Sequence, residues 1–188
     1  MLHHRVKNTL ATVQAVLNTA VRSSLSIPEF TRVLSGRIAS LARTHALITE
    51  DLAQAASFEG LLRAELDPYD ERERLTLEGP RGVLPSALVV PVGMALHELT
   101  TNALRHGSLA DPNGRLHVTW WVEDGPSSSG LRWDWSEHDG PPAEHPTRQG
   151  FGHRLLNKVL AVQTGAEVNV AFAPDGLRIS VRMPLPGA

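Results

Sequence analysis

The segment His3–Asn8, near the start of the chain, combines imidazole groups with cationic neighbours in the order His-His-Arg-Val-Lys-Asn. His4 lies outside the apolar stripe that Val6 and Leu10 begin, so we expect it to face solvent near the start of a helix. A neutral imidazole nitrogen is a nucleophile toward phosphorus, and nearby cations and a helix N-terminus would favour the charged phosphoimidazole. A basic, solvated helix end or an affinity-tag remnant would explain the same residues without chemistry.

A second polar group lies in His97–Gly107, a segment predicted to be helical. Glu98, Asn102 and His106 recur every four residues and therefore share one face of that helix. A carboxylate, an amide oxygen and an imidazole suit a hard cation that carries phosphate oxygens, since Mg²⁺ takes few protein oxygens. The segment is not a zinc-protease helix, because Thr101 stands where the second histidine of His-Glu-x-x-His is required. An ordinary amphipathic helix with a polar outer face is the alternative.

Two further segments carry residues that could contact a nucleotide. Gly150 and Gly152 precede a predicted helix, where backbone N–H groups can approach a phosphate. Glu137 ends a predicted strand, where its carboxylate could accept a hydrogen bond from the exocyclic amine of adenine. A loop-to-helix turn and a strand that ends in a polar turn are the respective alternatives. The chain contains no Walker phosphate-binding motif.

The N-terminal part of the chain is predicted to be a helical hairpin. Apolar residues at helical spacing form two stripes, over residues 6–20 and 34–52, and Ser26-Ile27-Pro28 between them marks a helix end and a new start. Neither helix can bury its stripe alone, so we expect dimerisation into a four-helix bundle. His45 is expected to be a core histidine of this bundle. The second stripe consists of Leu34, Ile38, Leu41, His45, Ile48 and Leu52.

The rest of the chain alternates predicted strands and helices. Helices are expected over residues 58–66, from residue 85 or 91 through 106, and over about 152–163. A short strand is expected near residues 74–77, and two hairpins of alternating strands near 116–135 and 168–183. The aperiodic, proline-rich residues 138–150 indicate a functional loop or lid. The predicted fold class is α+β, with antiparallel strands under about three helices.

Composition excludes several classes of protein. The 188 residues are 41% hydrophobic and 20% charged, with a net charge of −2 and no cysteine. Near-neutral charge argues against a nucleic-acid binder, and no apolar run approaches the ~18 residues of a membrane span. The missing cysteine excludes disulfides and thiolate zinc sites and favours the cytoplasm. Six basic and three acidic groups give residues 1–52 a charge of +3, and twelve basic and seventeen acidic groups give residues 53–188 a charge of −5. That split indicates two unlike parts.

Taken in order, these segments resemble the HWE-type sensor histidine kinases, a branch of two-component kinases within the Bergerat-fold ATPase superfamily. His4–Asn8 is similar to the phosphoacceptor box of that family, and His97–Asn102 with His106-Gly107 is similar to its N box. Trp135-Ser136-Glu137 is similar to its G1 box and Gly150-Phe151-Gly152 to its G2 box. His97, Trp135 and Glu137 are the three residues that name the family.

The resemblance implies a fold, a reaction and partners. Residues 1–54 would be a dimerisation and phosphotransfer hairpin, and residues 55–188 a Bergerat-type α/β sandwich that binds ATP and Mg²⁺. The γ-phosphoryl group would pass from ATP to His4 and then to an aspartate of a response-regulator receiver domain. Asn102 would carry Mg²⁺, and Glu98 would orient a Mg²⁺-bound water or help to deprotonate His4. The implied nucleotide-site residues are His97, Asn102, Arg105, His106, Trp135, Glu137, Gly140, Gly150, Phe151 and Gly152.

Three departures from the common pattern bear on this interpretation. Arg5 follows the acceptor histidine where the commonest histidine kinases have an acidic base, which is normal for this branch and leaves the base unassigned. Asp139 occupies a position where the family pattern has glycine, and residues 138–149 would form the ATP lid. The sensor module expected upstream is absent from these 188 residues. The competing functions are a non-catalytic phosphotransfer or docking module with a vestigial ATPase-like layer, and a same-fold ATPase or serine kinase that does not need His4.

Overall fold

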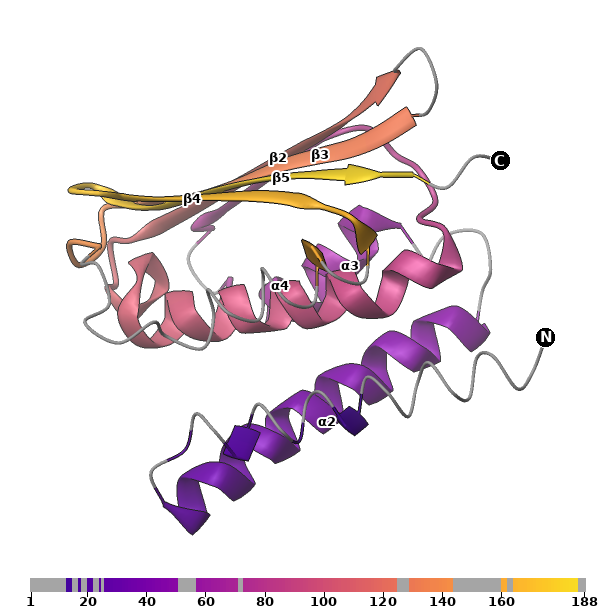
Figure 1. Cartoon of the computed structure of the whole chain (residues 1–188). Helices are drawn as coiled ribbons and strands as arrows, with labels where there is room; N and C mark the ends of the chain where they lie inside the picture. Colours follow the sequence, from indigo (N-terminus) through magenta and orange to yellow (C-terminus); the bar gives the residue numbers. More distant parts are fainter. Residues whose placement is uncertain are drawn as a thin grey trace.

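The computed structural model describes residues 13–14, 17, 20–21, 24, 26–50, 57–70, 73–124, 129–143, 160–161 and 164–185; of residues 43 and 45–50 it describes the backbone alone. Figure 1 shows these residues in three layers: a twisted sheet, the helices α3 and α4 beneath it, and α2 on the far side of α4. The fold is of the α+β class, as the alternation of strand and helix patterns predicts. In the described part of the chain, no helix has the length and apolar character needed to cross a membrane.

Serine residues mark where the helices α2 and α3 begin. The helix α2 spans Ile27–Glu50 and follows Ser26, whose hydroxyl accepts a hydrogen bond from the backbone N–H of Glu29. Ser57 caps α3, Phe58–Leu66, in the same way, since its hydroxyl accepts from the N–H of Gly60 at 2.9 Å. The helix α4 spans Ser86–His106, so the predicted helix starts at the earlier of its two possible positions and includes Pro91.

The sheet contains five strands in the order β1-β2-β3-β5-β4. The strand β1, Leu75–Glu78, runs parallel to β2, Arg115–Asp124, while every other neighbouring pair is antiparallel. The strands β3, Ser129–His138, and β5, Gly176–Pro184, form the centre with β2, and β4, Glu167–Ala173, lies at the edge. All five strands lie where the sequence predicts them.

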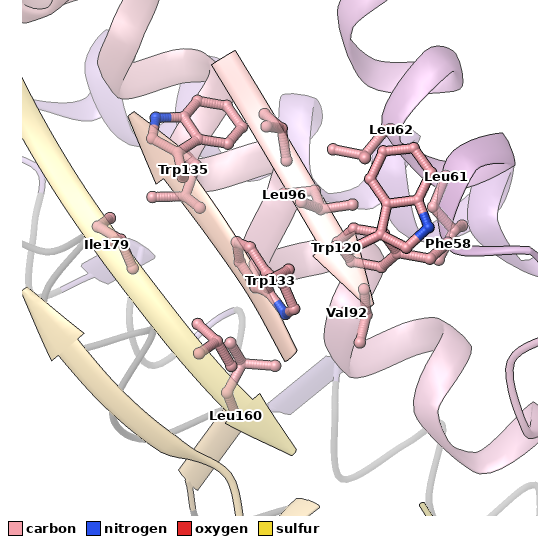
Figure 2. Packing of buried hydrophobic residues seen from close by; sticks show 14 of the residues in the cluster. Phe58, Leu61, Leu62, Val92, Leu96, Trp120, Trp133, Trp135, Leu160 and Ile179 are labelled. Carbon is pink, nitrogen blue, oxygen red and sulfur yellow. The ribbon is translucent and has the colours of Figure 1, made fainter. Parts of the chain in front are cut away.

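The core lies between the sheet and the layer of α3 and α4. Leu131, Trp133 and Trp135 alternate along the inner face of β3 and are buried. The ring of Phe58 lies 5.5 Å from those of Trp120 and Trp133 in tilted arrangements. Figure 2 shows these rings packed with Leu61 and Leu62 of α3 and with Val92 and Leu96 of α4. The indole rings therefore fix the distance and orientation of α4 relative to the sheet.

The face by which α2 packs on the rest of the molecule differs from the predicted apolar stripe. Ile38, a stripe residue, is 47% exposed, whereas Arg37, Ser40 and Thr44 are buried. The reason is the close approach of α2 to α4: a Cβ at Gly93 would lie 2.6 Å from Oγ1 of Thr44. Small side chains fit at the closest point of this approach. Of the stripe residues of α2, Leu41 is buried while Ile38 is exposed. The sequence predicts that this stripe is buried in a dimer, so the exposure of Ile38 in the single chain leaves that prediction open.

Candidate active site

The helix α4 has two buried faces, and the residues predicted to act in catalysis divide between them. Its apolar stripe packs toward the sheet and consists of Val92, Leu96, Leu99 and Ala103. Glu98 points instead toward α2, where its Oε1 lies 2.5 Å from Nε of Arg37. Glu98 is 6% exposed and Arg37 is 5% exposed, so this is a buried ion pair. The polar outer face expected for α4 is therefore covered at Glu98 by a second helix.

His97 lies beside this pair and joins three helices. Its Nδ1 is 2.8 Å from Oε2 of Glu65 on α3, and Oε1 of the same carboxylate accepts a hydrogen bond from the hydroxyl of Ser40 on α2 at 2.8 Å. A Cβ at Gly36 would lie 3.7 Å from Nε2 of His97. The imidazole is thus held between α2 and α3. We call the contacts of Arg37, Ser40 and Thr44 with Glu65, Gly93, His97 and Glu98 the α2–α4 interface.

The C-terminal end of α4 is more open. Asn102 is half-buried, and Arg105 and His106 are exposed. Gly107 ends the helix, and its N–H is shared between the carbonyls of Asn102 and Ala103 at 3.2 Å each. Among the described residues no three His, Asp or Glu side chains gather into a metal site. Asn102 can offer one amide oxygen to Mg²⁺, a donor set that suits this cation only together with phosphate oxygens and water.

Glu137 lies at the end of β3 and closes the core there. Its Oε2 accepts a hydrogen bond from the N–H of Ser108 at 2.8 Å, and its Oε1 accepts one from Nε1 of Trp135 at 3.1 Å. The side chain is 1% exposed. Burial raises the pKa of the Glu137 carboxyl above its ordinary value, and the bonds from Ser108 and Trp135 oppose the rise. We call Glu137, Trp135 and Ser108 the Glu137 cluster.

Three glycines allow the chain to pass close to this cluster. A Cβ at Gly107 would lie 1.9 Å from Oε2 of Glu137, and a Cβ at Gly176 would lie 2.1 Å from the carbonyl oxygen of Glu137. A Cβ at Gly140 would lie 2.4 Å from Cα of Ser108. Asp139 has a φ of 56°, in the left-handed region that glycine occupies most readily. This conformation gives a physical reason for glycine in the family pattern at this position.

Several predicted residues fall outside the described part of the chain. They are His4, Gly150, Phe151 and Gly152, and of the loop predicted as an ATP lid only residues 138–143 are described. Conversely, the sequence did not single out Arg37, Ser40, Glu65 or Ser108. A signal for Ser40 was present, because Gly36, Ser40 and Thr44 repeat a small residue every four positions. Such a repeat indicates a helix face that packs closely.

Comparisons with known proteins agree with this geometry. Residues 2–81 match the HWE histidine kinase family. The blue-light-activated histidine kinase of Brucella ovis is 30% identical over 184 residues, which are 97% of this chain and 38% of that protein. The protein of the same name from Brucella anthropi is 31% identical over 186 residues, 98% of this chain and 38% of that protein. This chain therefore spans well under half the length of these relatives.

Solved structures share the fold. The blue-light activated histidine kinase EL346 of Erythrobacter litoralis superposes with a TM-score of 0.66 at 20% identity, over 98% of this chain and 60% of that one. The histidine kinase domain of the same protein gives a TM-score of 0.58 at 22% identity, over 81% of this chain and 74% of the domain. This chain thus shares the fold of these two solved structures.

Proposed function

We propose that this chain is the core of a protein-histidine kinase, because residues 2–81 match the HWE histidine kinase family. It would transfer the γ-phosphoryl group of ATP to His4, and then to an aspartate of a response-regulator receiver domain. One observation supports this function above others: α4, which carries Glu98 and Asn102, packs directly on the hairpin helix α2. In this proposal the helix that carries the N box would border the module that carries His4.

The proposed first step is an in-line displacement. A ring nitrogen of His4 forms a bond to the γ-phosphorus, the bond from that phosphorus to the ADP oxygen breaks, and the imidazole proton leaves. Glu98 would accept this proton or orient a water molecule, and Asn102 would hold Mg²⁺. Arg105 and His106 are exposed at the end of α4, where their charge or hydrogen-bonding groups can approach the phosphates. When bound, Mg²⁺ supplies neutralisation of phosphate charge.

The remaining proposed nucleotide residues act from β3 and the loop after it. A carboxylate offers about four acceptor sites, and the contacts from Ser108 and Trp135 use two of those on Glu137. The exocyclic amine of adenine would use another, once the carboxylate becomes accessible. His97 and Trp135 would act by holding α4 and Glu137 in place. The remaining implied residues would lie near the phosphates, in or beside the predicted lid loop: Gly140, Gly150, Phe151 and Gly152.

We also propose that the hairpin forms a homodimer and that the protein is cytoplasmic. In the single chain Val13, Leu17 and Ile38 are each more than a third exposed, which leaves apolar helix surface for a second copy. Neither a nucleic acid nor a membrane is proposed as a partner. Analytical ultracentrifugation at micromolar concentration tests the dimer, and a monomer would contradict it.

Incubation with γ-labelled ATP and Mg²⁺ tests the kinase assignment. The wild type should become labelled in an acid-labile, base-stable form, and His4→Gln should lose the label. His117→Gln is a matched control, because this histidine is partly exposed on the outer face of the sheet, near Glu78. Full labelling of His4→Gln would contradict the acceptor assignment. No labelling, together with no binding of a non-hydrolysable ATP analogue in calorimetry, would favour the vestigial module.

A further inference from the structure

The buried ion pair between Arg37 and Glu98 joins a hairpin residue to the residue proposed to act on the imidazole proton. We propose that Arg37 is an inhibitory positioning residue: with α2 docked on α4 it occupies the Glu98 carboxylate, and phosphoryl transfer requires this pair to open. The inference rests on the proposed kinase function and adds a regulatory contact to it.

The first support is that the docked arrangement hides the carboxylate from any substrate. Glu98 is 6% exposed, and its Oε1 lies 2.5 Å from Nε of Arg37. A group that takes a proton from His4 or orients a water must come within about 3 Å of that partner. While α2 covers Glu98, Arg37 holds Oε1, and the small exposed fraction of the side chain leaves no room for an imidazole ring to approach. The docked state is therefore incompatible with a direct role of Glu98.

The second support is that the α2–α4 interface is closely fitted. Gly93 lets α2 approach until the side chain of Thr44 fills the space of a missing Cβ, and Ser40 donates to the Glu65 carboxylate that also holds His97. Ser40 is 1% exposed and Thr44 is 2% exposed. An interface of small and polar groups buries little apolar surface, so it can open at a lower cost than the tryptophan core.

The third support is that the interface covers Glu98 but leaves Asn102, the proposed Mg²⁺ ligand, open. Asn102, one turn further along α4, is only half-buried, and Arg105 and His106 beyond it are exposed. The docked state should therefore bind ATP and Mg²⁺ and fail at the transfer step. Removal of Arg37 leaves the Glu98 charge without its guanidinium and so disfavours the docked state. The expected effect falls on kcat rather than on KM for ATP.

The first test compares Arg37→Ala with Arg63→Ala. Arg63 forms a surface ion pair with Glu59 on α3, so its loss is a matched removal of an arginine away from Glu98. We expect Arg37→Ala to raise kcat for autophosphorylation about tenfold with KM for ATP unchanged, and Arg63→Ala to change neither. An unchanged or lower kcat in folded Arg37→Ala would overturn the proposal.

The second test locks the interface and uses the fact that the chain has no cysteine. A Cβ at Gly93 would lie 3.4 Å from Cβ of Thr44, close to the roughly 3.5–4.5 Å that a disulfide spans. The variant Thr44→Cys/Gly93→Cys should cross-link under oxidation, retain ATP-analogue binding and lose at least nine tenths of its labelling. Reduction of the same protein should restore the labelling, so the reduced form is its own control.

The outcomes separate this inference from the function on which it rests. Full labelling of the cross-linked protein would overturn the inhibitory contact while leaving the kinase assignment intact. Failure of the two cysteines to cross-link would contradict the docked arrangement itself. Absence of labelling in the wild type and in the reduced variant would overturn the kinase function and the inference with it.

Discussion

Two buried carboxylates, Glu98 and Glu137, occupy structurally opposite settings in this molecule. Glu98 lies between the helices α4 and α2 and faces the guanidinium of Arg37. Glu137 lies at the end of β3 and accepts hydrogen bonds from neutral donors, the N–H of Ser108 and the indole of Trp135. Figure 1 shows the separation of the two settings, since α2 lies beyond the layer of α4 while β3 belongs to the sheet.

This difference indicates which parts of the molecule can separate without unfolding of the rest. At the α2–α4 interface small polar residues pack on each other, and a charge pair is separated when the helices part. At the Glu137 cluster the carboxylate anchors the turn after α4 to the end of β3, beside the buried rings of Trp133 and Trp135. Damage to the Glu137 cluster should therefore lower the free energy of unfolding of the whole sheet domain. Damage to the α2–α4 interface should release α2 alone.

The largest expected effect comes from Gly176→Ala. Gly176 has a φ of 144°, and a Cβ there would lie 2.1 Å from the carbonyl oxygen of Glu137. Backbone must move to relieve this contact, so we expect a loss of about 2–4 kcal/mol in the free energy of unfolding. Urea denaturation followed by tryptophan fluorescence measures it. Gly82→Ala is the control, because nothing lies within 4 Å of a Cβ there, and equal loss in both variants would contradict the role of the contact.

Glu137→Gln breaks the same cluster through its hydrogen bonds. A glutamine has one acceptor oxygen, so its amide N–H₂ group must face either Ser108 N–H or Trp135 Nε1–H. We expect a loss of about 1–3 kcal/mol at neutral pH, measured by urea denaturation. Glu78→Gln, on a side chain that is 66% exposed, should stay within about 0.5 kcal/mol of the wild type.

The difference in unfolding free energy between the wild type and Glu137→Gln should depend on pH in one direction. Burial raises the pKa of Glu137 above 4.5, so the folded state binds this proton more tightly than the unfolded state. Its contribution to stability is fully present below the unfolded pKa and is lost as the pH rises through the folded pKa. The advantage of the wild type over Glu137→Gln should therefore grow as the pH falls from 7 toward 4.5. A constant difference would contradict the raised pKa.

The surroundings of Glu137 and of Glu98 also differ in how much of them the sequence predicts. Alternation along β3 placed Leu131, Trp133 and Trp135 on one inner face, and the structure buries all three. Glu137 continues that alternation, yet a carboxylate on an apolar face is buried only if donors meet it. Its partner Ser108 is 29 residues away, and no local pattern encodes such a pairing.

The α2–α4 interface was less predictable because two helix faces of α2 compete for burial. The apolar stripe is the stronger local signal. The single chain buries Leu41 of that stripe and leaves Ile38 exposed, and it also buries Ser40 and Thr44 of the small-residue face. Glu98 illustrates the same limit. The spacing of Glu98 and Asn102 predicted a shared polar face of the helix. That spacing could not reveal that Arg37, 61 residues away, covers one end of this face. Pairings between modules depend on docking, which periodicity does not describe.

Ser40→Ala should show the local character of the α2–α4 interface. It removes the hydroxyl that donates to Oε1 of Glu65, at an expected cost of about 1 kcal/mol. Hydrogen exchange should report faster opening of α2 amides with no change in the protected amides of α4. Ser35→Ala, at an exposed position of the same helix, should change neither. Equal loss of protection in α2 and α4 would mean that the interface and the sheet domain open together.

The smallest expected effect belongs to Asp139, which bounds the Glu137 cluster on its C-terminal side. At a φ of 56° a glycine has no Cβ to strain, although it loses more conformational entropy on folding. Asp139→Gly should therefore be stabilised by no more than about 0.5 kcal/mol, because aspartate already tolerates this region better than most residues. Asp139→Val should instead lose about 1–2 kcal/mol, since a β-branched side chain is strained there. Thermal unfolding of the three proteins measures both differences. If Asp139→Val were as stable as Asp139→Gly, the left-handed backbone at residue 139 would not be needed to hold Glu137 in contact with Ser108.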